Sequence, residues 1–288
     1  MSRPPQEWNR RRFLRTAGAA TLALVAGGVY VREIEPRWIQ FVRRPLPIPR
    51  CPRELHGWRL AHLSDLHVGP SVDPDYQISV LRHVATLAPE LVVFTGDFIT
   101  RFGPLSRSLG TLPRILEHFP HGRFGTFAVL GNHDYGQGWS HVEIAAQVVA
   151  HARNAGIHVL RNDHTTVRGL TFVGIDDLWA PRCQPQIALR GLTPDTSAIA
   201  LAHNPDTCDL PVWSNFRGWI LSGHTHGGQV RPPFLPPPLL PIKNRRYASG
   251  EVDLHDGRRL YVSRGIGNLL RVRFNVRPEV TVFTLQQA

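Results

Sequence analysis

The chain has 288 residues, of which 42 % are hydrophobic and 19 % charged, a balance that suits one globular domain with extensions and excludes a wholly disordered protein. Its net charge of +11 is uneven, because residues 1–50 hold ten Arg against three Asp or Glu, whereas residues 51–288 hold 23 Lys and Arg against 19 Asp and Glu. The basic excess therefore belongs mainly to the N-terminal segment, and composition gives no support for a nucleic-acid partner. Three distant cysteines, Cys51, Cys183 and Cys208, exclude a CxxC zinc ribbon and allow at most one disulfide.

Residues 1–30 are predicted to be a twin-arginine export signal or a membrane anchor. Arg10 and Arg11 form the arginine pair, Phe13 and Leu14 follow, and a run of small apolar residues comes next. The best candidate for a cleavage site, AGG at 26–28, is weak, so the segment is expected either to be removed or to stay in the membrane. In both cases the folded body should lie outside the cytoplasm, in the periplasm, after handling by the twin-arginine export machinery.

Residues 31–57 are predicted to be a linker and residues 58–288 one domain. Apolar runs that each end in a polar cluster predict buried strands. These runs are WRLAHLSD (58–65), ELVVFTGD (90–97), GTFAVLGNHD (125–134), TSAIALAHNPD (196–206) and GWILSGHTH (218–226). Apolar spacing of three and four residues predicts helices over 74–89 and 141–156, and alternation predicts antiparallel strands within 165–179, 258–267 and 278–286. The expected fold is α/β, a mixed β-sandwich flanked by helices.

The polar clusters that end the five runs carry the candidate chemistry. Parallel strands bring their carboxyl ends to one edge of a sheet, so these clusters should meet. Asp65 and His67, two apart in an extended segment, should project to the same side, and His224 and His226 likewise. Together the clusters supply seven oxygen and nitrogen donors and no sulfur: Asp65, His67, Asp97, Asn132, His203, His224 and His226.

Seven such donors exceed what one ion needs and suit two divalent ions bridged by a carboxylate. The mixture of carboxylate, amide and imidazole favours Mn, Fe, Zn, Co or Ni. A single catalytic zinc is disfavoured because the sequence has no HExxH, and serine hydrolase and P-loop chemistry are disfavoured because GxSxG and GxxxxGK[ST] are missing.

The motifs DxH, GD, GNHD, a later His and GHTH, in this order, closely resemble those of the calcineurin-like metallophosphoesterases. The resemblance covers roughly Trp58 to Leu285 and implies the four-layer αββα fold of that family. Together with the twin-arginine leader, it points to the small exported or membrane-attached bacterial phosphodiesterases, some of whose relatives cleave the pyrophosphate of UDP-2,3-diacylglucosamine.

The resemblance also implies roles for individual residues. Asp65, His67 and His226 would hold the first metal. Asn132, His203 and His224 would hold the second, with Asp97 bridging the two and a hydroxide between the ions as nucleophile. His133 would approach the leaving-group or phosphoryl oxygens, and Asp134 would orient the His133 ring and favour its protonated form.

The implied activity is hydrolysis of phosphodiester or pyrophosphate bonds, with a phospholipid or nucleotide-sugar lipid among the candidate substrates. Two alternatives are a UDP-2,3-diacylglucosamine pyrophosphatase of lipid A synthesis and, in a different class, a non-catalytic scaffold stabilised by metal. The scaffold is disfavoured because all the ligands and the histidine of GNHD are in place.

Three further motifs are not assigned to the metal set: for two of them both a structural and a functional role stay open, and the third is expected to be a surface turn. The proline-rich stretch 231–241 is expected to be a stiff loop, either a spacer or an apolar rim for a lipid-like substrate formed by its Phe and Leu residues. Arg245 and Arg246 either bind a second phosphate or lie in solvent. Asp176 and Asp177 are expected in a surface turn, because no strand end of the metal set includes them.

Overall fold

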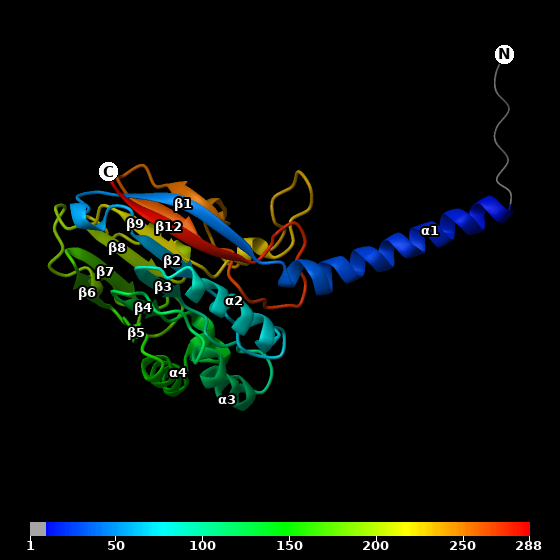
Figure 1. Cartoon of the computed structure of the whole chain (residues 1–288), viewed down its shortest axis with the longest axis horizontal. Coiled ribbons are helices and arrows are strands. Elements are labelled where there is room, and N and C mark those ends of the chain that lie inside the picture. The colour runs from blue at the N-terminus through cyan, green and yellow to red at the C-terminus, as the bar shows by residue number, and fades with distance from the viewer. Residues whose placement is uncertain (1–9) are drawn as a thin grey trace, which may run out of the picture.

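The computed structural model describes residues 10–288 and places two six-stranded sheets face to face (Figure 1). The first sheet has the order β1 (Gln40–Ile48), β12 (Glu279–Gln287), β2 (Arg59–Leu63), β3 (Leu91–Thr95), β4 (Thr126–Val129) and β5 (His158–Val159). The second has the order β10 (Gly250–Asp253), β11 (Arg259–Val262), β9 (Trp219–Ser222), β8 (Ala198–Ala202), β7 (Leu170–Ile175) and β6 (Asp163–Val167). Both sheets mix parallel and antiparallel pairs, which confirms the predicted mixed sandwich.

Side chains of the two facing sheet surfaces form the central core. Alternate residues of each strand point inward, and Phe127 of β4 stacks on Phe172 of β7 with ring centroids 4.6 Å apart. The outward residues of the first sheet, such as Val92 and Phe94, form a second core beneath the helices. The inner strands, such as β3, β4, β8 and β9, are buried on both faces, which explains their nearly continuous apolar sequences.

Helices cover the two outer faces unequally. The first sheet is covered by α2 (Pro74–Thr86), α3 (Leu105–Leu116) and α4 (Val142–Asn154) (Figure 1). The second carries only the short α5 (Pro185–Ala188), with irregular segments that bury Trp213, Phe216 and Tyr247. The fourth layer of the implied αββα arrangement is thus a mixture of short helix and loop. Helices α2 and α4 were predicted; α3 was missed because it contains Gly110 and Pro113.

The prediction that residues 31–57 form a linker is wrong. Strand β1 pairs in parallel with β12 over nine residues, and its Leu46 and Ile48 are completely buried. Upstream of β1, Glu35 is buried and its Oε1 accepts a hydrogen bond of 2.6 Å from the backbone N–H of Val276. The prolines and arginines of β1 do not suggest a strand in the sequence. A strand at the edge of a sheet nevertheless tolerates prolines, because its outer N–H groups need no partner.

Helix α1 (Arg10–Val29) projects away from the sandwich (Figure 1) and buries none of its residues. It begins a helical run of 28 residues, Arg10–Arg37, that is long and apolar enough to cross a membrane or to serve as a signal sequence. The first nine residues of the predicted leader lie outside the described residues. All three cysteines are free, so the one disulfide that the sequence allowed is not formed.

Candidate metal centre

The carboxyl ends of five strands converge at one end of the sandwich. In the first sheet β2, β3 and β4 run parallel and lead to Asp65 with His67, to Asp97 and to Asn132. In the second sheet β8 and β9 run parallel and lead to His203 and to His224 with His226. All seven predicted ligand residues meet here, and none is more than 4 % exposed.

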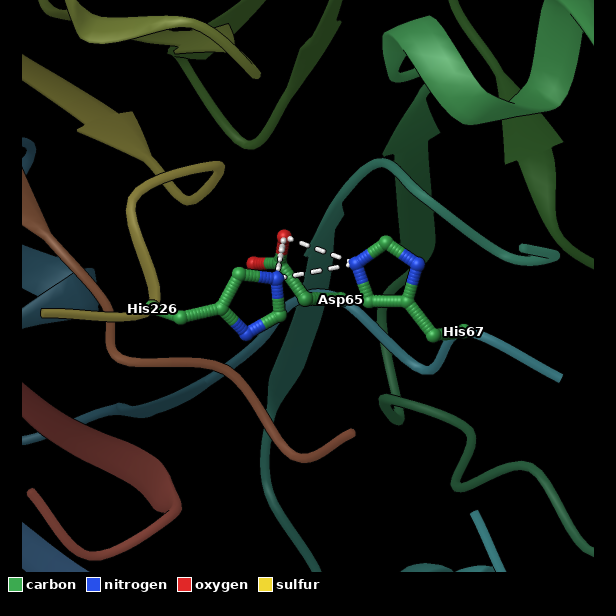
Figure 2. A group of neighbouring side chains, drawn as sticks. All are labelled: Asp65, His67 and His226. Atoms are coloured by element: carbon green, nitrogen blue, oxygen red, sulfur yellow. Dashed lines mark hydrogen bonds and ion pairs between the residues drawn. The ribbon is translucent and has the colours of Figure 1, made fainter. Parts of the chain in front are cut away.

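Asp65, His67 and His226 form the first of three overlapping clusters, of which one, His67 with Asp97 and His133, lies between the other two (Figure 2 shows the first). The Nε2 atoms of the two imidazoles point toward one another at 2.9 Å. The Oδ1 atom of Asp65 lies 3.4 Å from Nε2 of His226 and 3.7 Å from Nε2 of His67. One carboxylate oxygen and two imidazole nitrogens thus face a common point, as ligands of one ion do.

Asp97, His203 and His224 form another of the three clusters. Nε2 of His203 lies 3.1 Å from Oδ2 of Asp97 and 3.2 Å from Nδ1 of His224. The same Oδ2 atom lies 3.4 Å from Nε2 of His67, so Asp97 stands between the two clusters. Asn132 lines the cavity at this point, and its buried Oδ1 has no hydrogen-bond partner.

The backbone at the ligands is left-handed, which the sequence did not reveal. Asp65, His67, Asp97, His224 and His226 all have positive φ, between 50° and 71°. The extended geometry predicted for the two Asp/His and His/His pairs is therefore wrong. Asp65 and His67 nevertheless reach the same cluster, whereas the two histidines of GHTH lie in different clusters. L-residues rarely adopt this conformation, and it costs on the order of 1–3 kcal/mol for each residue.

Backbone carbonyls fix which nitrogen two of the histidines present to the centre. Nδ1 of His203 lies 2.7 Å from the carbonyl oxygen of Thr95, so that nitrogen carries a proton and Nε2 is the nitrogen that faces the centre, where it can take a second proton or a cation. Nε2 of His224 lies 3.0 Å from the carbonyl oxygen of Pro241, so its Nδ1 is the free nitrogen. Such partners orient metal-binding histidines in general.

Burial and neighbouring charges act in opposite directions on the pKa values of the centre. Burial lowers the pKa of His203, but the carboxylates of Asp97, Asp65 and Asp177 raise it to about 10. Burial also raises the pKa of Asp97, but the imidazoles of His203 and His133 hold it well below its usual range. The carboxylates attract positive charge strongly enough to keep a proton on His203, which is the electrostatic condition that a cation site requires.

His133 lies beside the clusters, but not as the sequence predicted. Its ring centroid is 4.7 Å from that of His67, and its Nδ1 accepts a hydrogen bond of 3.1 Å from the backbone N–H of Arg101. Burial lowers the pKa of His133 to about 3, so the ring is neutral and its proton is on Nε2. The Asp134 carboxylate accepts hydrogen bonds from backbone N–H groups, including those of Asp97 and Ile99, so the prediction that it orients His133 is wrong.

Four of the seven predicted ligands, Asp97, Asn132, His224 and His226, line a cavity of about 250 Å³ whose other walls are mostly aromatic. Trp139 and Trp179 pack with centroids 4.6 Å apart, and Trp179 also meets His224 edge-on at 4.6 Å. Phe102 and Arg101 close a further side. The motif search missed these residues, although Trp139 and Trp179 follow strand-end motifs by a few positions.

Two other groups near the centre differ from expectation. Asp176 and Asp177 are buried at the carboxyl end of β7, not in a surface turn. Asp176 accepts hydrogen bonds from Tyr135 and Arg161, whereas Oδ2 of Asp177 has no partner. Strands β6 and β7 form the expected antiparallel pair, but β7 also runs parallel to β8, which brings its carboxyl end to the same edge.

Arg273 is a further buried residue that no motif indicated. Its guanidinium donates to Oδ1 of Asn268 and to the carbonyl oxygen of Gly267, and it lies 3.5 Å from Nδ1 of His226. It thus supports the segment behind His226. Arg245 donates to the carbonyl oxygen of Pro237, and neither it nor Arg246 lines the cavity.

Comparison with known proteins agrees with this geometry. Residues 59–228, more than half of the chain, match the model of the calcineurin-like phosphoesterase family. The chain belongs to this family. It is 33 % identical to the phosphodiesterase YaeI of Escherichia coli K12, over 96 % of this chain and 99 % of that one. It is 30 % identical to the metallophosphoesterase YkuE of Bacillus subtilis 168, over 98 % and 99 %.

A third relative is the UDP-2,3-diacylglucosamine pyrophosphatase LpxG of Chlamydia trachomatis. The identity is 28 %, over 92 % of this chain and 95 % of that one. The calcineurin-like phosphoesterase is therefore a metal-dependent hydrolase of phosphate esters, with Asp and His side chains placed to bind metal.

Asp177 gives a pH-dependent prediction for the metal-free protein. Burial raises the pKa of its carboxyl to about 7, above its value in the unfolded chain, so folding stability falls as the pH rises between about 4 and 7. Asp177→Asn removes this cost. We expect a midpoint of thermal unfolding at least about 3 °C above wild type at pH 8 and no gain at pH 4, measured by circular dichroism.

Asp176→Asn is the matched control, because it weakens the contact with Arg161 and should lower the unfolding midpoint at pH 8. An equal effect of Asp177→Asn at both pH values would show that ionisation of Asp177 carries no cost.

Proposed function

We propose that the centre binds two divalent cations and hydrolyses phosphodiester or pyrophosphate bonds. Asp65, His67 and His226 hold one ion, Asn132, His203 and His224 hold the other, and Asp97 bridges them. The observation that carries this proposal is the position of Asp97 Oδ2, 3.4 Å from Nε2 of His67 and 3.1 Å from Nε2 of His203. The unpartnered Oδ1 of Asn132 fits the same assignment, since a buried amide oxygen needs a donor or a cation.

Nitrogen and oxygen donors without sulfur favour Mn, Fe, Zn, Co or Ni. When bound, such ions supply a nucleophile from water near neutral pH and neutralise charge on the phosphoryl oxygens. The chain's own residues hold the ligands in place, through the Thr95 and Pro241 carbonyls, and limit the entry of water with the aromatic wall of Trp139 and Trp179. A scaffold without catalysis would not need an open cavity beside these ligands.

His133 acts as a neutral hydrogen-bond donor in this proposal. Because Nδ1 accepts the Arg101 N–H, Nε2–H is the group free to donate to a non-bridging phosphoryl oxygen. Asp134 positions the loop instead: by accepting the N–H groups of Asp97 and Ile99 it fixes the turn after β3. The backbone N–H of His133 in turn donates to Oδ1 of Asp97 at 2.9 Å, so His133 also helps to orient that carboxylate.

The activities of two relatives, a phosphodiesterase and a UDP-2,3-diacylglucosamine pyrophosphatase, support a diester or pyrophosphate substrate over a monoester. The same relatives keep a phospholipid or nucleotide-sugar lipid among the candidate substrates. Both reactions require an attack on a phosphorus atom that carries two ester or anhydride groups, so one centre can serve either.

We also propose that the protein is exported by the twin-arginine route and stays in the cytoplasmic membrane through α1, with its metal centre in the periplasm. The arginine pair opens α1, and the helical run continues without a break into residues that pack on the domain. Glu35, at the end of that run, is anchored by Val276, so a cut at residues 26–28 would leave a short helical stub attached to the body.

Removal of the bridging carboxylate should distinguish a centre that binds two ions from one that binds a single ion. Asp97→Asn keeps the shape and an acceptor for the His133 N–H but loses the charge between the ions. We expect the kcat for bis-p-nitrophenyl phosphate to fall by at least about 10² and bound metal, measured by elemental analysis, to fall from two ions per chain to at most one. Wild-type enzyme should lose activity on chelation, regain it with Mn, Zn or Ni, and prefer the diester to p-nitrophenyl phosphate.

Asp163→Asn, an exposed substitution in β6, serves as the control and should leave both readouts unchanged. Full activity in Asp97→Asn would end the two-ion proposal.

Substitution of His133 can show which oxygen it contacts. A neutral donor to a phosphoryl oxygen is needed whatever the leaving group, so His133→Ala should lower kcat/KM by about 10²–10³ for both p-nitrophenyl and phenyl diesters. Metal content should stay at two ions per chain. Phenolate depends more than p-nitrophenolate on protonation as it leaves. A loss of kcat/KM confined to the phenyl diester would therefore assign His133 to the leaving-group oxygen instead.

Export can be tested with the arginine pair. Arg10→Lys combined with Arg11→Lys should leave the domain protected from protease added to spheroplasts, whereas wild type should be accessible and stay with the membrane pellet. Arg43→Lys with Arg44→Lys in β1 is the matched control. Unchanged accessibility in the leader variant would contradict the twin-arginine route.

A further inference from the structure

An apolar groove of about 590 Å³ adjoins the cavity that holds the metal ligands. The two spaces share four lining residues, Phe102, His226, Pro241 and Leu269, so they adjoin. Two loop segments, 238–241 and 269–272, supply most of the groove's lining, and their side chains there are Leu, Pro and Val. The cavity that contains the candidate metal ligands therefore lies directly beside a hydrocarbon-lined groove.

Both loops also carry apolar side chains into solvent. Leu239 is 79 % exposed and Leu270 71 % exposed, and Phe234, at the tip of the proline-rich loop, is fully exposed. Exposed leucines at two adjacent loops are costly unless they contact an apolar partner. Of the rim residues that the sequence suggested, Leu239 and Leu240 line the groove, whereas Phe234 and Leu235 do not.

The groove lies at the end of the domain from which α1 departs. The backbone N–H of Arg273 donates to the carbonyl oxygen of Val31 at 2.9 Å, and Arg271 pairs with Glu33 at 2.5 Å. These contacts tie the loop that contains Leu270 and Val272 to the segment just after α1. Figure 1 shows both loops beside the inner end of that helix. A bilayer that held α1 would therefore lie next to the mouth of the groove.

We propose that the groove binds a hydrocarbon chain of the substrate while the substrate's phosphate lies at the metal centre, and that this chain comes from a lipid of the adjoining bilayer. The proposal rests on the proposed function and names its substrate class: an amphiphilic phosphate ester or anhydride. The four residues that line both the groove and the metal-ligand cavity carry the proposal, and the neighbouring apolar helix and exposed leucines indicate where such a substrate resides. Each methylene moved from water into an apolar site strengthens binding roughly fourfold.

The test compares chain lengths on one head group. Full-length protein reconstituted in lipid nanodiscs is assayed with p-nitrophenyl butyl and p-nitrophenyl octyl phosphate below their aggregation concentrations. We expect kcat/KM for the octyl diester to exceed that for the butyl diester at least tenfold in wild type. Leu239→Asp and Leu270→Asp, both at exposed positions that the fold tolerates, should reduce this ratio to about three or less, chiefly through a lower kcat/KM for the octyl diester.

Leu235→Asp is the matched control, since Leu235 belongs to the same loop and is 59 % exposed but does not line the groove. It should keep the wild-type ratio. Two results would overturn the groove assignment. One is the absence of an octyl preference in wild type. The other is an equal preference in all four proteins, because partition of the octyl diester into the bilayer would then account for that preference.

A binding measurement separates this inference from the proposed function. Butylphosphonate and octylphosphonate are titrated calorimetrically into the same nanodiscs, with empty discs subtracted. Tighter binding of octylphosphonate by at least tenfold in wild type and Leu235→Asp, but not in the two groove variants, supports the groove even if neither diester is hydrolysed. Hydrolysis of both diesters without a chain-length effect in turnover or binding supports the proposed function and refutes the groove.

Discussion

Burial of two ionised carboxylates among imidazoles is the constraint on which this structure depends. Asp65 and Asp97 are almost completely removed from water, and an ionised carboxylate in such a place is costly unless positive charge lies beside it. Divalent cations meet that requirement, and without them a proton on His203 meets it in part. The two sheets create this environment. Each sheet buries its inner strands on both faces, and the parallel strands of each sheet end at the edge where these side chains lie.

The sequence predicted the contents of the centre well because the signals are local. An apolar strand followed by a polar cluster can be recognised in a single stretch of chain, and the seven residues that five such stretches nominated as ligands do lie together at one edge. The errors came from features set by tertiary contacts. Strand β1 looked like a linker because its pairing partner, β12, is more than 200 residues away. Asp177 looked exposed because the direction of β7 cannot be read from its alternation, and α3 was hidden by Gly110 and Pro113.

Pro241 contributes both to the metal centre and to the apolar groove. The carbonyl oxygen of Pro241 holds the proton-bearing nitrogen of His224, while the rest of Pro241 lines both cavities. The proline-rich loop is therefore both a wall for substrate and a support for a ligand. Its stiffness follows from its composition, since each proline fixes its own φ and restricts the residue before it. A mobile loop in this place would leave the orientation of His224 undefined.

The left-handed backbone at five ligand residues has a consequence for how this protein can change over generations. Each of those side chains is kept in a conformation that glycine would adopt freely, so the folded chain carries a standing conformational cost in exchange for its chemistry. Under the proposed function, replacement of such a residue by glycine would remove a metal ligand and at the same time relieve that cost. A substitution that removes activity would then stabilise the fold, so only selection for catalysis retains these residues.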